Sequence, residues 1–505
     1  MSQQNKTAVV IGAGIAGMTS ALLLGMNGYK VSLVETEKQI GQTLRGFYKS
    51  RVYFDSGMHF AGELSEHGLL SAYLRYLGVS GLDCLDFDQD CFEKVRFSDN
   101  NDFNIPIGYE KVIESLVDAF PAEKQGIVKY MQLLRKAYYV SPYHSLSMDV
   151  GTGAERDHPE LLVSTTQVIE QHVSNPYLRT LLAVPCLYHG VSPDETPFLR
   201  HAWVAGTHLD SVRTFTHGGL SLVEAYEQRL KDLGATFYCG RRAVKLHCRD
   251  SGEIKAVELD DGEILSCDTA IYTGHPHYLP ELMPEGALRP GARKRLRELQ
   301  DGMAAHLLYL TNDSTPPDIM NRKNVVYCRH DLPLSQQFNV TNGEKNSPFY
   351  ICAGPAALRY SAGLSDRGGD YIAIEPCSPD EYLPYYGTGG ARRPDGYRAL
   401  KKKRLAEFSA RLFETLPEME GMRVVGGGSP LTLQRYLHTP HCGLYGVAHD
   451  RHQFTPMPNT KIPGFYLAGQ GVTAPGILGS LISAFVACGY LFGHSHLLDG
   501  VRACK

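Results

Sequence analysis

The stretch that decides the fold is Ala8-Val-Val-Ile-Gly-Ala-Gly-Ile-Ala-Gly17. Its first four residues are apolar and largely β-branched, which is typical of a buried strand in a parallel sheet. The next six have the spacing GxGxxG, and residues 18–26 predict a helix that Asn27-Gly28 ends. A second strand follows over 30–34, and Glu35 ends it. This order predicts a doubly wound α/β domain of the Rossmann type that binds a dinucleotide.

Each part of this motif has a physical task. Gly12 permits the tight turn, and Gly14 lets the backbone approach a pyrophosphate. Ala16 and Gly17 lie in the first helical turn, where free N–H groups and the helix dipole favour phosphate and where a small residue lets the helix pack on the sheet. Glu35 is placed to accept a hydrogen bond from a ribose 2′-hydroxyl, which argues against NADP in this site.

The composition is that of an ordinary globular protein of two linked domains. The 505 residues are 43% hydrophobic and 21% charged, with a formal net charge of −4. Such a balance argues against a nucleic-acid partner. The twelve cysteines have no CxxC pair or zinc-like spacing, which favours reduced thiols. The opening residues are polar and do not read as a signal peptide, so we expect a cytoplasmic protein.

Two segments are candidates for contact with a membrane. Residues 477–492 are apolar but shorter than the roughly 20 residues of a spanning helix, so they predict a buried helix. The basic run Lys401-Lys-Lys-Arg404 predicts a solvated helix face. Peripheral contact with a membrane, to collect an apolar substrate, remains open, as does the oligomeric state.

Several further motifs carry a resemblance to a known family. They are Phe54-Asp-Ser-Gly-Met-His-Phe-Ala-Gly62, Ile105-Pro-Ile-Gly-Tyr109, Phe215-Thr-His-Gly-Gly219, Gly428-Ser-Pro-Leu-Thr432, Gly443-Leu-Tyr-Gly446 and Tyr466-Leu-Ala-Gly-Gln470. In this order the chain resembles the FAD-dependent phytoene desaturase, carotenoid isomerase and retinol saturase family, most of all its retinol saturase branch.

The resemblance implies FAD as the cofactor and adds residues that would bind it. One departure is Gln42, where the family usually has a second glycine. The additional cofactor-binding residues implied in this way are Thr36, Gly41, Thr43, Leu44, Arg45, Asp55, Ser56, Gly57, Met58, Val244, Gly274, Gly469, Gln470, Gly476, Ile477 and Leu478.

We expect the two domains to be interleaved along the chain. The alternation over 253–264, with Asp261-Gly262 as its turn, predicts a hairpin, and residues 268–274 predict a buried strand that feeds a glycine turn. The expected FAD-binding segments are 1–62, 215–285 and 425–505, and an α+β substrate domain would take 63–214 and 286–424. No second GxGxxG follows a strand, so we expect no NAD(P)H domain. The hydride would come from the substrate, from transiently bound NAD(P)H or from another protein.

Three residues are candidates for catalysis. His59 follows the flavin segment and could donate a proton or act as a hydrogen-bonding support. Tyr445 and Arg435 lie in the family-like segment near the carboxyl terminus and could line a polyene channel or serve the core and surface. The aromatic stretch with Tyr188, His189, His201 and His208 is on the expected substrate side, where packing roles are more common.

We predict no metal site. The histidine pairs 275/277, 438/441 and 449/452 lie in loops broken by proline and glycine, and none has an evident third ligand.

These features together predict an FAD-dependent oxidoreductase that acts on carbon–carbon double bonds of a long conjugated polyene. The saturase-like motifs favour reduction, and reductive cyclisation of a polyene natural product is a form of it. The alternatives are a carotenoid-type desaturase, a redox-neutral isomerase, an amine oxidase, and a flavin-bearing escort protein without catalysis.

Overall fold

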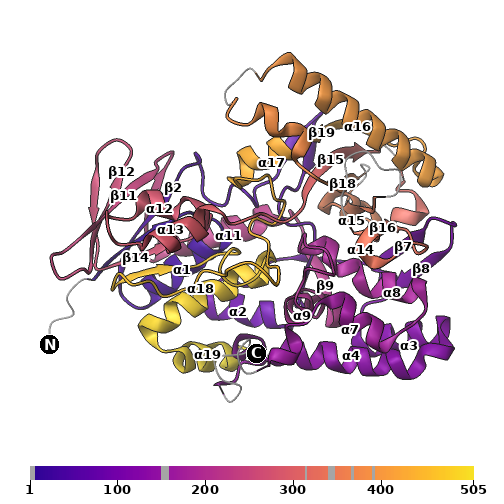
Figure 1. Ribbon diagram of the computed structural model, residues 1–505, viewed down its shortest axis with the longest axis horizontal. Helices are drawn as coiled ribbons and strands as arrows, with labels where there is room; N and C mark the ends of the chain where they lie inside the picture. The colour runs from indigo at the N-terminus through magenta and orange to yellow at the C-terminus, as the bar shows by residue number, and fades with distance from the viewer. Residues whose placement is uncertain (1–5, 149–157, 313–314, 339–346, 366–368, 389–392) are drawn as a thin grey trace.

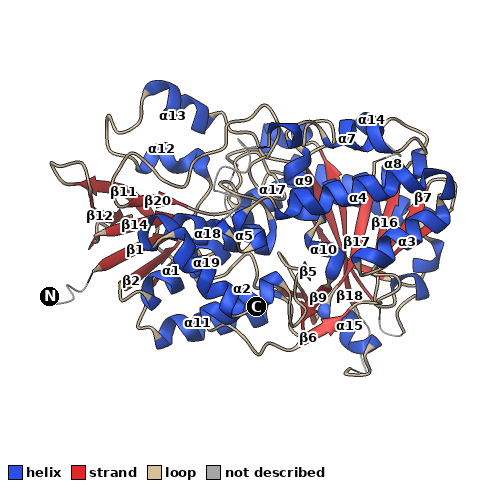
Figure 2. Cartoon of the chain, turned by 90° about the horizontal axis from the view of Figure 1, so that it is seen from below, coloured by secondary structure: helices blue, strands red, loops and turns tan. Residues whose placement is uncertain are grey.

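Two sheets, set side by side, organise the molecule (Figures 1 and 2). The computed structural model describes residues 6–148, 158–312, 315–338, 347–365, 369–388 and 393–505. The smaller sheet lies with both chain ends on its side of the molecule, and the larger sheet forms the other half (Figure 2).

The smaller sheet has five parallel strands in the order β10-β2-β1-β14-β20. Its strands are β1 (Thr7–Ile11), β2 (Lys30–Glu35), β10 (Thr236–Cys239), β14 (Thr269–Tyr272) and β20 (Phe465–Leu467). Since three distant parts of the chain supply these strands, residues far apart in sequence end at the same edge. The predicted strands and the doubly wound fold are confirmed.

Helices pack in one core on one face of this sheet, whereas a small three-stranded sheet and two short helices pack on the opposite face. α18, the apolar segment tested above as a membrane span, packs against α1 and has ten buried residues. Within the described residues no helix is long and apolar enough to cross a membrane. The helices of this half are α1 (Ile15–Met26), α2 (Leu69–Leu77), α11 (Gly219–Asp232), α12 (Leu279–Leu282), α13 (Pro290–Arg297), α18 (Gly476–Phe492) and α19 (His494–Ala503).

A three-stranded antiparallel sheet is attached to this half. It contains β11 (Ala243–Cys248), β12 (Ile254–Leu259) and β13 (Ile264–Ser266). β12 and β13 pair with Glu258 opposite Ile264, so the hairpin predicted around Asp261-Gly262 is confirmed.

The larger sheet has seven strands in the order β19-β15-β18-β17-β16-β7-β8. Neighbouring strands pair antiparallel except β16 and β7, which are parallel. Its strands are β7 (Glu93–Phe97), β8 (Asp102–Ile105), β15 (Ala304–Thr311), β16 (Asn324–Cys328), β17 (Phe349–Ala353), β18 (Asp370–Cys377) and β19 (Arg423–Gly428).

The two faces of the larger sheet are covered by different helices, because side chains alternate along each strand. One face, with Val95, Val326 and Tyr350, packs in a core with the helices seen in front of the sheet in Figure 2. They include α3 (Tyr109–Ala119), α4 (Lys124–Tyr139), α7 (Thr165–His172), α8 (Pro176–Ala183) and α9 (Phe198–Ala205). The opposite face, with Val325 and Phe349, packs against α15 (Pro355–Ser361) and α16 (Asp395–Thr415).

Short elements connect the two halves. They are β3 (Phe47–Lys49) with β4 (Val52–Phe54), the small sheet of β5 (Ala61–Gly62), β9 (Val212–Phe215) and β6 (Cys84–Asp86), and the helices α5 (Pro142–Ser145), α10 (Thr207–Asp210) and α17 (Pro430–Leu437). α14 (Leu334–Gln337) instead packs beside α8 in the half of the larger sheet. We propose that the two large sheets mark the two interleaved domains expected from the sequence. β19 then lies across the proposed boundary at residue 425.

Candidate functional site

The glycine turn after β1 fits a pyrophosphate. A Cβ on Gly17 would lie 1.9 Å from the carbonyl oxygen of Gly12, so α1 approaches the turn as only glycine allows. A Cβ on Gly14, in contrast, would meet no described atom within 4 Å. The first turn of α1, which is described in full, has neither a side-chain cap nor an acidic residue. Its N–H groups are therefore left for an anion.

Glu35 is held at the end of β2 by backbone N–H groups. Its Oε2 accepts a hydrogen bond from the Ala13 N–H at 2.8 Å, and its Oε1 accepts from the Glu37 N–H at 2.9 Å and the Thr36 hydroxyl at 3.1 Å. Because each carboxylate oxygen has two lone pairs, Glu35 can still accept from a ribose. Ala16 lies in the buried first turn of α1 nearby.

The segments around residues 43 and 57 lie directly against each other. A Cβ on Gly57 would lie 2.0 Å from the Thr43 carbonyl oxygen, and the Ser56 hydroxyl donates to that oxygen at 3.1 Å. Gly41, at φ +66°, donates its N–H to the Ala13 carbonyl. Leu44 and Met58 are buried beside them. These segments therefore form one surface next to the glycine turn.

Arg45 and Asp55 have protein partners at this surface. The Arg45 guanidinium donates to the Ile40 carbonyl and pairs with Glu227 at 2.7 Å. Asp55 is fully buried, and its carboxylate accepts the Gly219 N–H at 3.0 Å, at the start of α11. Burial raises the pKa of Asp55 well above its usual range. Both side chains thus hold the loop in place.

The carboxyl ends of β14 and β20 complete the site. Gly469, at φ +112°, donates its N–H to the buried Ser483 hydroxyl of α18 at 2.6 Å. Gly476, at φ +83°, opens α18, and a Cβ there would meet no described atom within 4 Å. Ile477 and Leu478 follow in the first turn, which has no side-chain cap or acid among its described residues. A second helix N-terminus is therefore available to an anionic group.

The part of the remaining predicted residues, Gly274, Val244 and Gln470, in binding the cofactor stays a prediction. Gly274 directly follows Thr273, whose hydroxyl donates to the Ile11 and Gly12 carbonyls. Val244 is 38% exposed on β11. The Gln470 side chain lies against Gly446, where a Cβ would be 2.7 Å from its Nε2.

The three catalytic candidates do not lie together. Burial lowers the pKa of His59 to about 4, so its imidazole is neutral at pH 7. The Tyr445 hydroxyl is 2.8 Å from that of Tyr350, a residue of the larger sheet. Arg435 is exposed on α17, with its guanidinium over the Tyr436 ring. Whether any of them takes part in catalysis stays a prediction.

The structure brings together an aromatic group that the sequence analysis did not assemble. Tyr188 contacts Phe60, His208 and Tyr350 edge to face, with ring centroids 5.5–5.7 Å apart. We call these four residues the aromatic box. The Tyr188 hydroxyl donates to the carboxyl of Glu93, which is 2% exposed. Phe60 directly follows the predicted flavin residues, but Tyr350 and Glu93 lie on strands that no motif marked.

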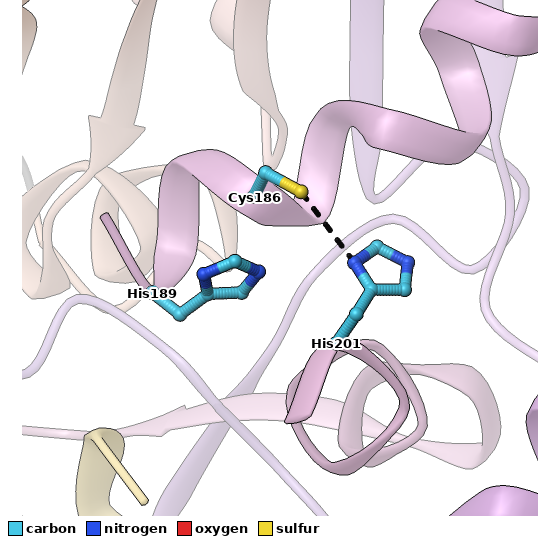
Figure 3. A group of neighbouring side chains, drawn as sticks. All are labelled: Cys186, His189 and His201. Atoms are coloured by element: carbon cyan, nitrogen blue, oxygen red, sulfur yellow. Dashed lines mark hydrogen bonds between the residues drawn. The ribbon is translucent and has the colours of Figure 1, made fainter. Parts of the chain in front are cut away.

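Cys186, His189 and His201 form a buried group of three potential metal ligands (Figure 3). The Cys186 thiol and the His201 Nδ1 are 3.6 Å apart, and the His201 Nε2 is 3.2 Å from the Tyr130 hydroxyl. The His189 Nε2 is buried without a hydrogen-bond partner among the described residues. Burial raises the pKa of the thiol and lowers that of His201 to about 3. That no metal binds to these three residues stays a prediction.

Two of the histidine pairs noted in the sequence meet in space. The rings of His277 and His441 are 5.9 Å apart, and His275 Nε2 is 2.8 Å from Asp301 Oδ1. The Asp301 carboxylate also accepts the His441 N–H. Among the described residues these side chains do not gather three ligand atoms around one point, so the group reads as a structural network.

A family model supplies the identification. The model described as flavin containing amine oxidoreductase matches residues 15–316, more than half of the chain. The chain belongs to this family. The matched segment begins at Ile15, directly after the glycine turn, and includes α1, the loop of residues 41–58 and β14.

Individual relatives agree with the resemblance seen in the sequence, which is confirmed. The chain is 24% identical to all-trans-retinol 13,14-reductase of Rattus norvegicus over 95% of this chain and 84% of that protein. It is 22% identical to a zeta-carotene-forming phytoene desaturase of Myxococcus xanthus over 74% of this chain and 72% of that one. An oxidoreductase from Methanosarcina mazei has the same fold, with a TM-score of 0.67 at 15% identity over 95% of this chain and 98% of that one.

This family of flavin enzymes fits the site. The open space at Gly14, the carboxylate of Glu35 and the uncapped starts of α1 and α18 match a pyrophosphate, a ribose and the flavin ring. Bound flavin supplies hydride transfer to or from carbon. The protein is an FAD-dependent oxidoreductase.

Proposed function

We propose that this protein uses FAD to reduce a carbon–carbon double bond of a long, apolar, conjugated substrate. The observation that carries the proposal is the similarity along 95% of the chain to all-trans-retinol 13,14-reductase. The match to the phytoene desaturase of Myxococcus xanthus covers less of this chain, so we prefer reduction to desaturation.

The larger sheet supports an apolar substrate. Its face towards the flavin-binding segments is lined by apolar and aromatic side chains in one buried core. Phe47 and Phe54, from the hairpin β3–β4, contact Tyr309 of this face at ring distances of 4.9 and 5.5 Å. This apolar and aromatic face therefore suits a polyene substrate. The residues of this face include Val95, Ala305, Leu307, Tyr309, Val326, Cys328, Tyr350, Cys352, Ile372 and Ile374.

The finer assignments are also proposals. His59 and Tyr445 would border the reacting part of the substrate, and Arg435 would lie outside it on α17. A nicotinamide would reduce the flavin by transient binding, since no second GxGxxG provides a domain for it.

The test is anaerobic rapid mixing of the purified flavoprotein with NADPH or NADH, followed by a polyene. We expect the flavin absorbance to bleach and then to return when all-trans-retinol or phytoene is added. If neither nicotinamide bleaches the flavin, the proposed donor is wrong. If dithionite-reduced protein is not reoxidised by either polyene, reduction itself is wrong.

The alternatives give distinct results in the same experiment. A desaturase would be bleached by the polyene without nicotinamide, and an amine oxidase by an amine such as putrescine. A reductive cyclase would give a product with one ring more than simple reduction does, which mass and NMR spectra distinguish.

Peripheral membrane contact is a proposal about how the substrate arrives. Tyr48 and Tyr436 are 76% and 49% exposed, and Lys49 lies close to Lys401 and to Gly426 of β19. Exposed aromatic and basic side chains together suit an anionic membrane surface. Sedimentation with anionic vesicles, and not with neutral ones, is the expected result.

A further inference from the structure

The aromatic box contacts a buried acid, Glu93, through the hydroxyl of Tyr188. Glu93 opens β7, in register with Asn324 of β16. Alternation puts its side chain on the same face as Val95, and Val326 connects that face to Tyr350 through the register of β16 with both neighbours. Glu93 is therefore on the face that meets the flavin-binding half.

The surroundings of Glu93 favour the protonated form of its carboxyl group. The carboxyl is 2% exposed and has the buried thiols of Cys328 and Cys352 as neighbours. Burial raises its pKa to about 8. At pH 7 most Glu93 side chains are therefore carboxylic acids, and each can give up a proton.

Hydrogen bonds and ring contacts run from Glu93 to the flavin segments. The Tyr188 hydroxyl bonds to Glu93, and the Tyr188 ring contacts both Phe60 and Tyr350. The Tyr350 hydroxyl in turn bonds to Tyr445 at 2.8 Å. Phe60 follows the flavin loop, and the residue after Tyr445 lies against Gln470. The box thus lies between the acid and both flavin-binding segments.

Other protic groups in and next to the aromatic box suit proton donation less well. Burial lowers the pKa of His59 and of His208 to about 4, so both imidazoles are neutral at pH 7. Burial raises the pKa of Tyr350 and Tyr445 above the usual range of a phenol, which makes them weaker acids. Among these groups, the carboxyl of Glu93 has the acidity closest to neutral pH.

We propose that Glu93 is the acid that protonates the substrate during double-bond reduction, and that Tyr188 orients its carboxyl. This inference rests on the proposed function and names the proton source of that reaction. One carbon of the double bond receives a hydride, with its two electrons, from the reduced flavin. The other carbon takes the proton from Glu93, as the carboxyl O–H bond breaks and a C–H bond forms.

The charges balance over one turnover. The carboxylate left on Glu93 accepts the hydrogen bond of the Tyr188 hydroxyl and regains a proton from solvent. The flavin is reduced again by a nicotinamide. The carbon that takes its proton from Glu93 therefore carries solvent deuterium when the product is made in D₂O.

The test isolates the oxidative half-reaction. Protein reduced with dithionite under anaerobic conditions is mixed with all-trans-retinol or phytoene, so the identity of the natural donor does not matter. In Glu93→Gln we expect flavin reoxidation to slow by about a hundredfold or more. In the wild type the rate should fall as the pH rises through about 8, where the carboxyl ionises, and Glu93→Gln should lose this dependence.

Two variants keep the result interpretable. Glu63 is a second buried glutamate that also accepts a hydrogen bond from a tyrosine, Tyr138. Glu63→Gln should retain the wild-type reoxidation rate within about twofold. Tyr188→Phe should retain flavin but shift the pH at which the rate falls. Equal flavin content in Glu93→Gln and the wild type, and a cooperative melting transition in both, exclude misfolding as the cause.

Each outcome of this test either supports or overturns the assignment of Glu93 as the acid. If Glu93→Gln reoxidises at the wild-type rate with the wild-type pH dependence, the acid is another group and the inference is overturned. If the reduced wild type reacts with neither polyene, the proposed function fails, and the inference falls with it. A slow, pH-independent Glu93→Gln beside a normal Glu63→Gln supports the assignment.

Discussion

Gly14 and Gly17, which follow β1, have different roles, although both are fixed glycines of the GxGxxG motif. Gly17 is required by the protein, because a Cβ there would lie 1.9 Å from a backbone oxygen. Gly14 is required by the ligand, because a Cβ there meets open space where the pyrophosphate is expected.

This difference predicts a contrast between two alanine variants. Gly17→Ala should destabilise the apoprotein by about 1–3 kcal/mol, as other overpacked sites do. Gly14→Ala should leave the apoprotein as stable as the wild type but weaken FAD binding by about tenfold, or 1.4 kcal/mol. Thermal unfolding of the apoprotein and FAD titration measure the two effects. Equal losses of apoprotein stability would contradict the assignment.

The buried acid Glu93 predicts a dependence of stability on pH. Its folded-state pKa, about 8, lies above the usual value of roughly 4.3 for glutamate. The folded state therefore holds this proton more tightly than the unfolded state. The stabilisation is present below the lower value and is lost as the pH rises towards 8.

Replacement by glutamine removes this dependence. The melting temperature of Glu93→Gln should rise relative to that of the wild type as the pH is raised from 5.5 to 8. Differential scanning calorimetry of both proteins at each pH measures it. A constant difference between the two would mean that Glu93 does not change its proton affinity on folding.

The prediction that no metal binds can be tested at the group of Cys186, His189 and His201. The thiol is bonded to His201, and burial disfavours its ionisation, so we expect less than about one tenth of a metal ion per chain. Elemental analysis of protein purified without chelators measures the content. One zinc or copper per chain, lost together in Cys186→Ser and His189→Gln, would overturn this prediction.

At the scale of the helices and strands, a small number of buried hydrogen bonds join the elements that form the site. α18 would present its N-terminus to the flavin, and Ser483 fixes this helix to the loop after β20 by accepting the Gly469 N–H. The Ser483 hydroxyl itself donates to the Ser480 carbonyl. The loop and the helix are thus joined by one buried side chain.

Ser483→Ala should therefore leave a buried N–H unpaired and cost about 1–3 kcal/mol of stability. Flavin affinity should fall as well, because the start of α18 is released. Ser480→Ala, on the same helix, is the control and should change both properties less. Urea unfolding and FAD titration give the two numbers, and identical behaviour of both variants would refute the role of the tether.

At the scale of the whole molecule, no long segment of the chain is independent. β7 and β8 lie within residues 63–214, but β7 pairs with β16, and β9 pairs with both β5 and β6. An excised fragment 63–214 should therefore not fold. Its circular dichroism and NMR dispersion should be those of an unfolded chain, and a cooperative unfolding transition would contradict the interleaved arrangement.

The sequence by itself determined the cofactor-binding part of this architecture. The strand over 8–11, the GxGxxG turn, the helix after it and Glu35 are local signals, because backbone geometry and phosphate binding need those residues at that spacing. The hairpin at Asp261-Gly262 was predictable for the same reason. The motifs near both ends also indicated the flavin and the family.

Only the tertiary structure decided what lies opposite the flavin segments. Glu93, Tyr188 and Tyr350 are separated by 95 and 162 residues along the chain, and no local pattern couples them. Strand register put Glu93 and Tyr350 on one face, and helix packing brought Tyr188 onto it. The residues of the cofactor-binding turn are consecutive in the sequence, so a local pattern identifies them. The residues opposite the flavin segments come from strands that meet only after folding.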